Sequence, residues 1–297
     1  MTARVQERAH AKINLNLSIH GRRPDGYHEL SSLVAFAADI YDVVTLSPAD
    51  GFALDVGGAF GHKLSGDGNL IETANQLAQQ LLPDLQSGQF HLVKSIPIAS
   101  GVGGGSADAA AALRALAKIN GLGAEPEAFR KLAPRIGADV PVCLSGQGHR
   151  AAFMQGIGEK VFRHCEGDFW RDGDVHAVLV NPRIEVSTAD VFRSLNAPML
   201  SEFTDVAPPE PFSDVASLVA YLQTTKNDMQ SAAVALAPVI GDVLQSLEGM
   251  PHCLLARMSG SGATCFGLFA TADNADQARL LLEAQSNGWW IAATRLV

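Results

Sequence analysis

The 297-residue sequence lacks any long apolar run and any closely paired cysteines. No stretch of 18 apolar residues occurs, and the first twenty residues contain no continuous apolar segment of the kind that directs export. The four cysteines, Cys143, Cys165, Cys253 and Cys265, form no C-x-x-C pair, so neither a zinc site nor a disulfide framework is indicated. We therefore expect a cytoplasmic protein with reduced thiols and no membrane partner.

Positive charge is also scarce. The chain carries 22 lysines and arginines against 31 aspartates and glutamates, for a formal net charge of −9. Because nucleic-acid-binding domains are usually basic, we expect no nucleic-acid partner. Nothing in the sequence indicates an obligate protein partner. An anionic ligand would have to be held by local hydrogen-bond donors, since the overall field repels it.

One glycine-rich segment is the most informative part of the chain: Ile96–Leu113, with the sequence IPIASGVGGGSADAAAAL. Glycines let backbone N–H groups close on an anion without a side chain in the way. The alanine-rich run that follows is a strong helix former, and its positive dipole end would point at the same anion. The segment therefore predicts a phosphate-binding loop, although a flexible surface loop before an ordinary helix is the alternative.

Several kinds of phosphate loop are excluded by what this segment lacks. No lysine lies between Gly101 and Leu113, as a Walker loop would require. A dinucleotide fingerprint that began at Gly101 would end on Ser106, and one that began at Gly103 would end on Asp108, so neither is complete. The HRD and DFG triplets of protein kinases are absent as well.

The pattern of apolar residues predicts strands alternating with helices. Residues 9–20 alternate between apolar and polar, which indicates one strand whose second face, with Lys12, Asn14 and Asn16, is either solvated or the wall of a site. The other expected elements that bear on function are a helix over 69–82, a strand over 89–94, a helix over 106–119, a helix over 228–247 and a strand–glycine–strand unit over 253–269. These elements favour an α+β protein of two domains, 1–147 and 148–297, with the boundary at Gly146–Gly148.

Two further clusters are ambiguous by themselves. Asp139 stands between Gly137-Ala138 and the strand-like run that begins at Val140, where it could cap a turn or act as a base. The segment 257–264, Arg-Met-Ser-Gly-Ser-Gly-Ala-Thr, could be a simple hairpin with small turn residues, or part of a ligand site.

Taken with the glycine-rich loop, these clusters resemble the motifs of the GHMP kinases, which phosphorylate small alcohols such as galactose, homoserine and mevalonate. The spacing of Pro97 to Gly101–Ser106 resembles the Pro-x3-Gly-Leu-Gly-Ser-Ser motif of that family, and 257–264 resembles its C-terminal glycine motif. The blocks run in family order from residue 11 to about 269. The segment Asp25-Gly26-Tyr27-His28 further resembles a subgroup that acts on a cytidine diphosphate substrate in the non-mevalonate route to isoprenoid precursors.

The resemblance implies a two-domain GHMP kinase fold with the active site in a cleft between the domains. It implies ATP and Mg2+ as cofactors, with the metal ligands unknown, and a small-molecule cytidine diphosphate substrate. Lys12 and Asp139 match the catalytic pair. The residues that match the substrate site are Asn14, Tyr27, His28, Thr188 and Phe192. Those that match the ATP site are Asn69, Lys94, Pro97, Ile98, Ala99, Ser100, Gly101, Val102, Gly103, Gly104, Gly105 and Ser106, although Asn69 could equally be a helix N-cap.

The sequence departs from the family pattern at two positions. Val102 replaces a leucine, which should pack similarly, and Ala107 replaces a serine, so no metal or phosphate contact is expected from its side chain. Two alternatives remain open. A GHMP kinase for homoserine or mevalonate would leave Tyr27 and His28 unexplained. A nucleotide-binding module without chemistry would not need Lys12 and Asp139.

Overall fold

The computed structural model describes residues 4–64, 68–123, 125–145, 151–163, 169–172, 175–203, 205–285 and 288–297. The chain forms two compact units, each made of several separate segments of the sequence. Unit 1 consists of Met1–Ala11, Ile40–Ile98 and Gly103–Gly148, and unit 2 of Lys12–Asp39, Ala99–Val102 and His149–Val297. The predicted domain boundary at 147/148 lies outside the described residues and stays a prediction.

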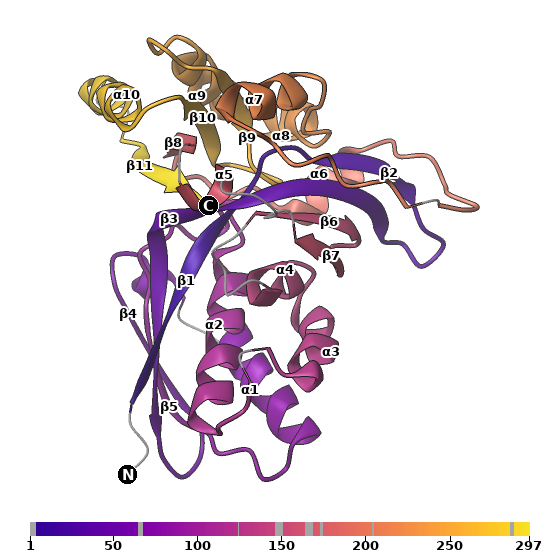
Figure 1. Ribbon diagram of the computed structural model, residues 1–297, viewed down its shortest axis with the longest axis vertical. Helices are drawn as coiled ribbons and strands as arrows, with labels where there is room; N and C mark the ends of the chain where they lie inside the picture. Colours follow the sequence, from indigo (N-terminus) through magenta and orange to yellow (C-terminus); the bar gives the residue numbers. More distant parts are fainter. Residues whose placement is uncertain are drawn as a thin grey trace. The chain divides into compact units, whose positions relative to one another are not determined.

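Unit 1 is a layer of strands with helices on one face (Figure 1). Its strands are the first part of β1 (Val5–Asn14), the second part of β3 (His28–Pro48), β4 (Ala53–Gly57) and β5 (Gly88–Val93). β5 pairs with β3 antiparallel and with β4 parallel. The helices of unit 1 are η1 (Gly61–Lys63), α1 (Leu70–Leu81), α2 (Gly104–Ile119), α3 (Glu127–Ile136) and α4 (Val140–Leu144).

The alanine-rich helix is confirmed, and it begins two residues earlier than predicted, at Gly104. It is stopped by Gly121, whose φ of +63° is accessible to glycine at little cost. There the N–H of Leu122 donates to the carbonyl of Ala117 and that of Gly121 to the carbonyl of Lys118, which satisfies carbonyls at the helix end. Apart from the first turn, nearly every residue of α2 is buried, so this helix is the centre of unit 1.

The predicted single strand over 9–20 is wrong at its middle. The structure has two strands, β1 and β2 (Ser18–Arg22), because the backbone changes partner at Leu17, whose N–H donates to the carbonyl of Lys226. The polar face is also not solvated: Lys12, Asn14 and Asn16 are 3%, 1% and 3% exposed. Buried polar groups require partners, so this face belongs to a polar interior.

Unit 2 is built on an antiparallel sheet in the order β11-β8-β10-β9. Its strands include the end of β1, β2 and the first part of β3, followed by β6 (Ala152–Gly156), β7 (Lys160–Arg163), β8 (Val175–Asn181), β9 (Leu255–Met258), β10 (Cys265–Phe269) and β11 (Trp290–Leu296). Its helices are α5 (Phe169–Asp172), α6 (Thr188–Ser194), α7 (Val215–Gln223), α8 (Gln230–Leu236), α9 (Val239–Glu248) and α10 (Ala272–Ala284).

Two elements of the structure differ from those predicted. The strand-like run after Asp139 is the short helix α4, with Pro141 in its first turn, where a missing N–H costs nothing. The predicted helix over 228–247 is divided into α8 and α9, because Pro238 cannot continue α8 and is instead the N-cap of α9. The combination of sheets and helices agrees with the predicted α+β class. Among the described residues, no helix is both long and apolar enough to cross a membrane.

Arg257 is a buried cation of unit 2 that makes several hydrogen bonds. Its side chain donates to the carbonyls of Leu15, Leu222 and Thr225, each at 2.8 Å. Burial lowers its pKa to about 10, which leaves it charged near neutral pH. The arginine thus joins the chain just after β1 to the segment that follows α7.

We expect Arg257→Met to lower the free energy of unfolding by about 3 kcal/mol or more, because two buried carbonyls and one partly buried carbonyl lose a charged donor together. Chemical denaturation of the purified variant measures this loss. Arg295→Met, at an exposed arginine of β11, is the matched control and should change stability by less than about 0.5 kcal/mol. Equal effects of the two changes would show that the three hydrogen bonds of Arg257 do not hold unit 2 together.

Candidate active site

The first half of the glycine-rich loop, Ala99–Val102, belongs to unit 2 and lies directly against the turn after β9. Gly101 has a φ of +73°, and a Cβ placed on it would lie 2.5 Å from the carbonyl oxygen of Gly262 and 2.6 Å from that of Ser259. In the same way, a Cβ on Gly260 would lie 2.7 Å from the carbonyl oxygen of Gly101. Only glycine allows this approach of two backbones, so the two glycine clusters of the sequence meet in one place.

Asn14 is held beside this contact by a chain of buried hydrogen bonds. The hydroxyl of Ser259 accepts from the N–H of Asn14 and donates to the carbonyl of Gly101, both at 3.0 Å. The Asn14 amide donates to Ser32 Oγ at 2.8 Å. Its Oδ1 is buried without a hydrogen-bond partner among the described residues, and a Cβ on Gly260 would lie 3.3 Å from it. A buried acceptor in this position is suited to a donor from a ligand.

Two neighbours of Asn14 complete this part of unit 2. The backbone N–H of Lys12 donates to the carbonyl of Val102 at 2.9 Å, which ties the predicted catalytic lysine to the glycine-rich loop. Asn227 donates to the carbonyls of Met258 and Gly260, at 2.8 Å each, and so shapes the turn after β9. Ser32 and Asn227 are additional to the predicted site residues, and Ser259 belongs to the predicted 257–264 cluster. The carbonyls that Asn227 contacts lie 31 and 33 residues later in the sequence.

The second half of the loop belongs to unit 1 and begins α2. Gly103 is the N-cap, with a φ of +64°, and α2 follows from Gly104. The first N–H groups of a helix have no partner within it, and the helix dipole adds partial positive charge at the same end. The first amides of α2, at Gly103–Ser106, are therefore suited to an anion, and the binding of phosphates there stays a prediction.

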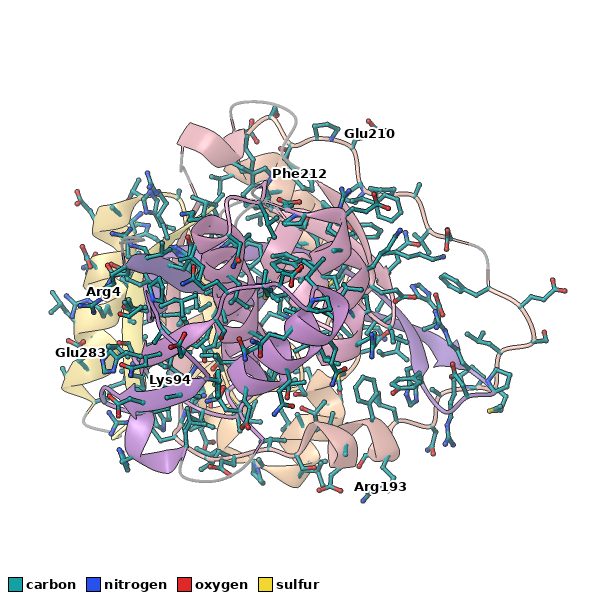
Figure 2. All side chains as sticks on the ribbon, turned by 90° about the horizontal axis from the view of Figure 1, so that it is seen from below. Arg4, Lys94, Arg193, Glu210, Phe212 and Glu283 are labelled. Atoms are coloured by element: carbon teal, nitrogen blue, oxygen red, sulfur yellow. The ribbon has the colours of Figure 1, made fainter. Side chains whose placement is uncertain are left out.

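A buried cluster of charges lies beneath this terminus. Lys94, which follows β5 and is labelled in Figure 2, places Nζ 2.5 Å from Asp42 Oδ2 and 2.6 Å from Asp108 Oδ2. All three side chains are at most 3% exposed. The pKa of Asp108 is raised to about 7, chiefly by burial, and the charge of Asp42 acts in the same direction against Lys94. The two carboxylates were missed by the sequence analysis, because nothing local marks Asp42 on a strand as a partner of Lys94, 52 residues later.

Asp139 lies at the start of α4, within unit 1, and its side chain does not cap the helix. A side-chain cap of the helix is therefore excluded, and the role of Asp139 as a base stays a prediction. The residue two positions earlier, Gly137, approaches the loop: a Cβ there would lie 3.7 Å from Ser106 Oγ. Asn69 does cap α1, since its Oδ1 accepts from the N–H of Ile71 at 2.9 Å.

The predicted residues Tyr27 and His28 lie just before β3 and at its start, respectively, and Phe192 of α6 contacts His28. Tyr27 is 59% exposed, and its backbone N–H donates to Asp25 Oδ1 at 3.0 Å, which closes the turn. His28 stacks on Phe192 with ring centroids 4.7 Å apart and an interplanar angle of 24°. Burial, with a smaller contribution from the charge of Arg22, lowers the pKa of His28 and so favours the neutral ring near neutral pH. Thr188, which begins α6, shares a 2.7 Å hydrogen bond with Ser261.

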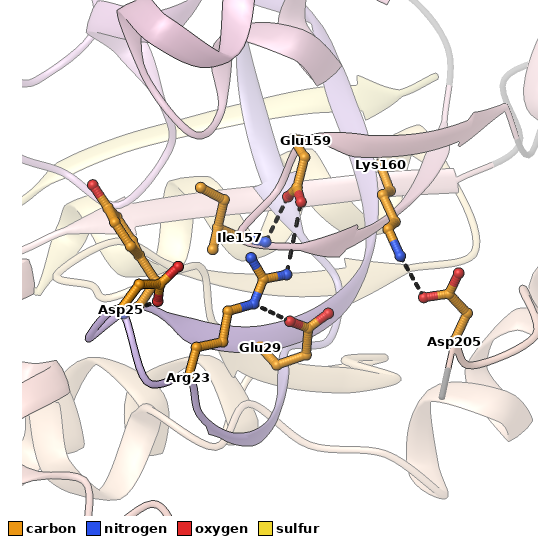
Figure 3. Close-up of polar contacts among 8 residues, drawn as sticks. Arg23, Asp25, Glu29, Ile157, Glu159, Lys160 and Asp205 are labelled. Carbon is orange, nitrogen blue, oxygen red and sulfur yellow. Dashed lines mark hydrogen bonds and ion pairs between the residues drawn. The ribbon is translucent and has the colours of Figure 1, made fainter. Parts of the chain in front are cut away.

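An ion-pair network anchors the turn that carries Tyr27 (Figure 3). The Arg23 guanidinium pairs with Glu29 and lies 3.7 Å from Glu159, whose carboxylate accepts from the N–H of Ile157 at 2.6 Å. The network joins the β2–β3 turn to the β6–β7 turn. Because Arg23 and Glu29 flank the Tyr27–His28 segment in the sequence, their ion pair fixes the position of this segment.

The structure thus groups the predicted residues within each unit. Unit 2 brings Lys12 and Asn14 together with Ala99–Val102, and His28 together with Phe192. Unit 1 brings the start of α2 together with Lys94 and with the segment before Asp139. Lys12 and Asp139 belong to different units, and their pairing stays a prediction.

We expect Gly101→Ala to be far more damaging than Gly121→Ala. Both glycines have positive φ, so alanine strains the backbone by about 1 kcal/mol at either position. Around Gly121, however, nothing lies within 4 Å of the added Cβ, whereas at Gly101 backbone atoms lie at 2.5–2.8 Å. Denaturation curves should therefore show an additional loss of about 2 kcal/mol or more for Gly101→Ala. Equal losses would contradict the close contact between the loop and the 259–262 turn.

Comparison with known proteins assigns an N-terminal and a C-terminal part of the chain to the same family. The family description "GHMP kinases N terminal domain" matches residues 69–147, and "GHMP kinases C terminal" matches residues 212–285. The chain is 44% identical to a 4-diphosphocytidyl-2-C-methyl-D-erythritol kinase of Parvibaculum lavamentivorans, with 98% of each chain covered. It is 45% identical to the protein of the same name from Methylobacterium radiotolerans, with 98% of this chain and 99% of the other covered.

Solved structures agree. A crystal structure of 4-(cytidine 5'-diphospho)-2C-methyl-D-erythritol kinase matches with a TM-score of 0.73 at 29% identity, covering 98% of this chain and 99% of the other. A homoserine kinase from Cytophaga hutchinsonii matches with a TM-score of 0.66 at 15% identity, covering 100% and 98%, which indicates a shared fold. The predicted GHMP kinase fold is confirmed, and the chain belongs to the 4-diphosphocytidyl-2-C-methyl-D-erythritol kinases of the GHMP kinase family.

Proposed function

We propose that this protein transfers the γ-phosphoryl group of ATP to the 2-hydroxyl of 4-diphosphocytidyl-2-C-methyl-D-erythritol, in the cytoplasm, on the non-mevalonate route to isoprenoid precursors. The full-length similarity to kinases named for this substrate supports the assignment. The observation of geometry that carries it is the buried, unpartnered Oδ1 of Asn14 beside the contact of Gly101 with Gly260. An alcohol hydroxyl is a donor of the right size for that acceptor.

The transfer is an in-line displacement. The oxygen of the alcohol attacks the γ-phosphorus, the bond from that phosphorus to the β–γ bridging oxygen breaks, and ADP leaves. We propose that Asp139 accepts the hydroxyl proton and that Lys12 keeps this carboxylate ionised and stabilises charge on the alcohol oxygen. Asn14 Oδ1 is proposed to accept a hydrogen bond from a neighbouring hydroxyl of the substrate and so to align it, since the single proton of the reacting hydroxyl goes to Asp139. The proposal requires Lys12 and Asp139 to reach one substrate atom in the reacting complex.

The ATP phosphates are proposed to bind the amides of Gly103, Gly104, Gly105 and Ser106 at the start of α2. The rest of the proposed ATP site is formed by Asn69, Lys94, Pro97, Ile98, Ala99, Ser100, Gly101 and Val102. Mg2+ is proposed to enter as the complex with ATP, where it neutralises charge on the β- and γ-phosphates. The described residues contain no group of three or more His, Cys, Asp or Glu side chains that could hold a metal ion, so its ligands are not assigned.

The cytosine base is proposed to bind at the β2–β3 turn. The exposed ring of Tyr27 offers a stacking face, and the neutral ring of His28 offers polar atoms to the edge of the base. Phe192 stacks on His28 and so supports its ring, and Thr188 supplies a hydroxyl near Ser261. These groups distinguish a cytidine substrate from homoserine or mevalonate, which have no base to stack.

The activity is tested by incubating the purified protein with MgATP and one alcohol at a time, with products followed by phosphorus NMR. The cytidine diphosphate substrate should yield a new phosphomonoester, and homoserine and mevalonate should not. Product from either of these two alone would favour the other GHMP kinases. ATP binding without product from any alcohol would favour a module without chemistry.

Asp139→Asn should lower kcat by about 10²- to 10⁴-fold, because the variant cannot accept the proton. The Kd for ATP should stay within about twofold of the parent value, since the phosphates are held by the loop amides. Asp84→Asn, at an exposed aspartate of the same unit, is the matched control and should keep kcat. A variant at 139 that retains more than about a third of kcat would remove Asp139 from the base role.

Tyr27→Ala should weaken binding of the cytidine substrate by about ten- to hundredfold, because base–aromatic stacking contributes about 1–3 kcal/mol. Tyr27→Phe keeps the ring and should restore most of the affinity. His28→Ala should act in the same direction as Tyr27→Ala by removing polar contacts. Calorimetry with each substrate separately gives the measurement. Weaker ATP binding with unchanged cytidine-substrate binding would refute the assignment of this turn.

A further inference from the structure

The Lys94–Asp42–Asp108 cluster holds both ends of the phosphate loop. Asp42 Oδ1 accepts from the N–H groups of Ser95 and Ile96, at 2.5 and 2.8 Å, and these residues lead directly into the loop. Asp108 lies on α2 soon after the loop ends. Lys94 Nζ bridges the two carboxylates, so a single ammonium connects the entry of the loop with its exit.

The position of Lys94 is itself determined by its backbone. Its N–H donates to the carbonyl of Gly57 at 2.9 Å, and its carbonyl accepts from the N–H of Phe60 at 3.1 Å. A Cβ on Gly58 would lie 2.5 Å from that carbonyl oxygen, so the 57–60 segment packs closely on Lys94. The first residue of α2 is also close, since a Cβ on Gly104 would lie 3.1 Å from Lys94 Nζ. The ammonium is thus enclosed between the end of β5 and the start of α2.

The charge of the cluster is unbalanced if both carboxylates are ionised. Asp42 accepts two backbone N–H groups and an ammonium, which stabilise its charge. Asp108 is fully buried, and its Oδ1 has no hydrogen-bond partner among the described residues. Lys94 and Asp42 are the charged groups that act on Asp108 in the described part of the chain; α1, α3 and α4 also pack on α2 and bring none to it. The raised pKa of Asp108 agrees with a proton shared at this site near neutral pH.

We propose that Lys94, Asp42 and Asp108 are positioning residues for ATP: they fix the spacing of the two ends of the phosphate loop, and Lys94 supports the phosphates through this cluster without touching them. The proposal rests on the proposed function only in taking ATP as the ligand of the loop. It assigns roles to two carboxylates outside the predicted site and changes the role of Lys94. A proton on Asp108 makes the cluster neutral, which avoids a buried negative charge beneath the phosphates.

The first test compares binding of MgATP by calorimetry, which does not depend on turnover. Lys94→Met should raise the Kd for ATP by about tenfold or more, because two buried carboxylates lose their shared partner and the loop ends separate. Lys118→Met, at an exposed lysine of the same helix, is the matched control and should leave the Kd unchanged. An unchanged Kd in folded Lys94→Met would overturn the proposal.

The double variant Lys94→Met with Asp42→Asn separates a positioning role from a phosphate contact. The new amide of residue 42 can still accept from Ser95 and Ile96, and its NH2 group can donate to Asp108. The ends of the loop are then tied again without a lysine. We expect the Kd to recover by about fivefold or more relative to Lys94→Met. A double variant that binds ATP as weakly as Lys94→Met would indicate direct contact of Lys94 with a phosphate and overturn the proposal.

The second test uses Asp108→Asn and stays decisive if Lys94→Met does not fold. The parent protein should bind MgATP more weakly as the pH rises through about 7, because Asp108 ionises beneath the phosphates. Asp108→Asn cannot ionise, so the ratio of parent Kd to variant Kd should rise about threefold or more between about pH 6 and about pH 8.5. The ratio cancels the titration of ATP itself. A ratio that does not change with pH would contradict the proton on Asp108. Absence of turnover with unaltered ATP results would count against the proposed function and leave this inference intact.

Discussion

The approach of one backbone to another at Gly101 is the constraint on which much of unit 2 depends. Because no Cβ separates Gly101 from the turn after β9, one serine hydroxyl, that of Ser259, can reach both the loop carbonyl and the N–H of Asn14. Asn14 in turn reaches Ser32, so a buried polar chain extends from the loop to β3. A side chain at position 101 would move the loop away and leave several of these groups unpaired.

The two units solve the problem of a buried cation in different ways. In unit 2, Arg257 is satisfied by three backbone carbonyls, each a neutral partner in a fixed place. In unit 1, Lys94 is satisfied by two carboxylates, so that its site includes groups whose charge depends on pH. The planar guanidinium suits several carbonyls in different directions, and the compact ammonium suits a tight pair of oxygens. The carbonyls around Arg257 stabilise the fold, whereas the carboxylates around Lys94 also make the charge of their site depend on pH.

Local sequence features predicted the parts of the site that depend on neighbours in the chain. The glycine-rich loop and the alanine-rich helix were both visible, because backbone conformation and helix propensity are properties of a few adjacent residues. The break after β1 was not, because it results from pairing of Leu17 with a segment more than 200 residues away. The same reason explains why Asp42 was missed. The polar face of Lys12 and Asn14 could be recognised as a pattern, but its burial depends on segments that only the fold brings together.

Helix α2 has a further consequence, which concerns entropy. Ala109, Ala110, Ala111, Ala112 and Ala115 are completely buried, and alanine has no rotamers to lose when it becomes buried. At these five positions the helix behind the phosphate loop is therefore ordered without a loss of side-chain freedom, and they add no side-chain torsions that could change later. Its small side chains also bring the neighbouring helices α1 and α4 close to its axis. The phosphate loop is thus followed by a helix whose central alanines leave few side-chain torsions to change. The first amides of this helix do not have to be reordered when an anion binds.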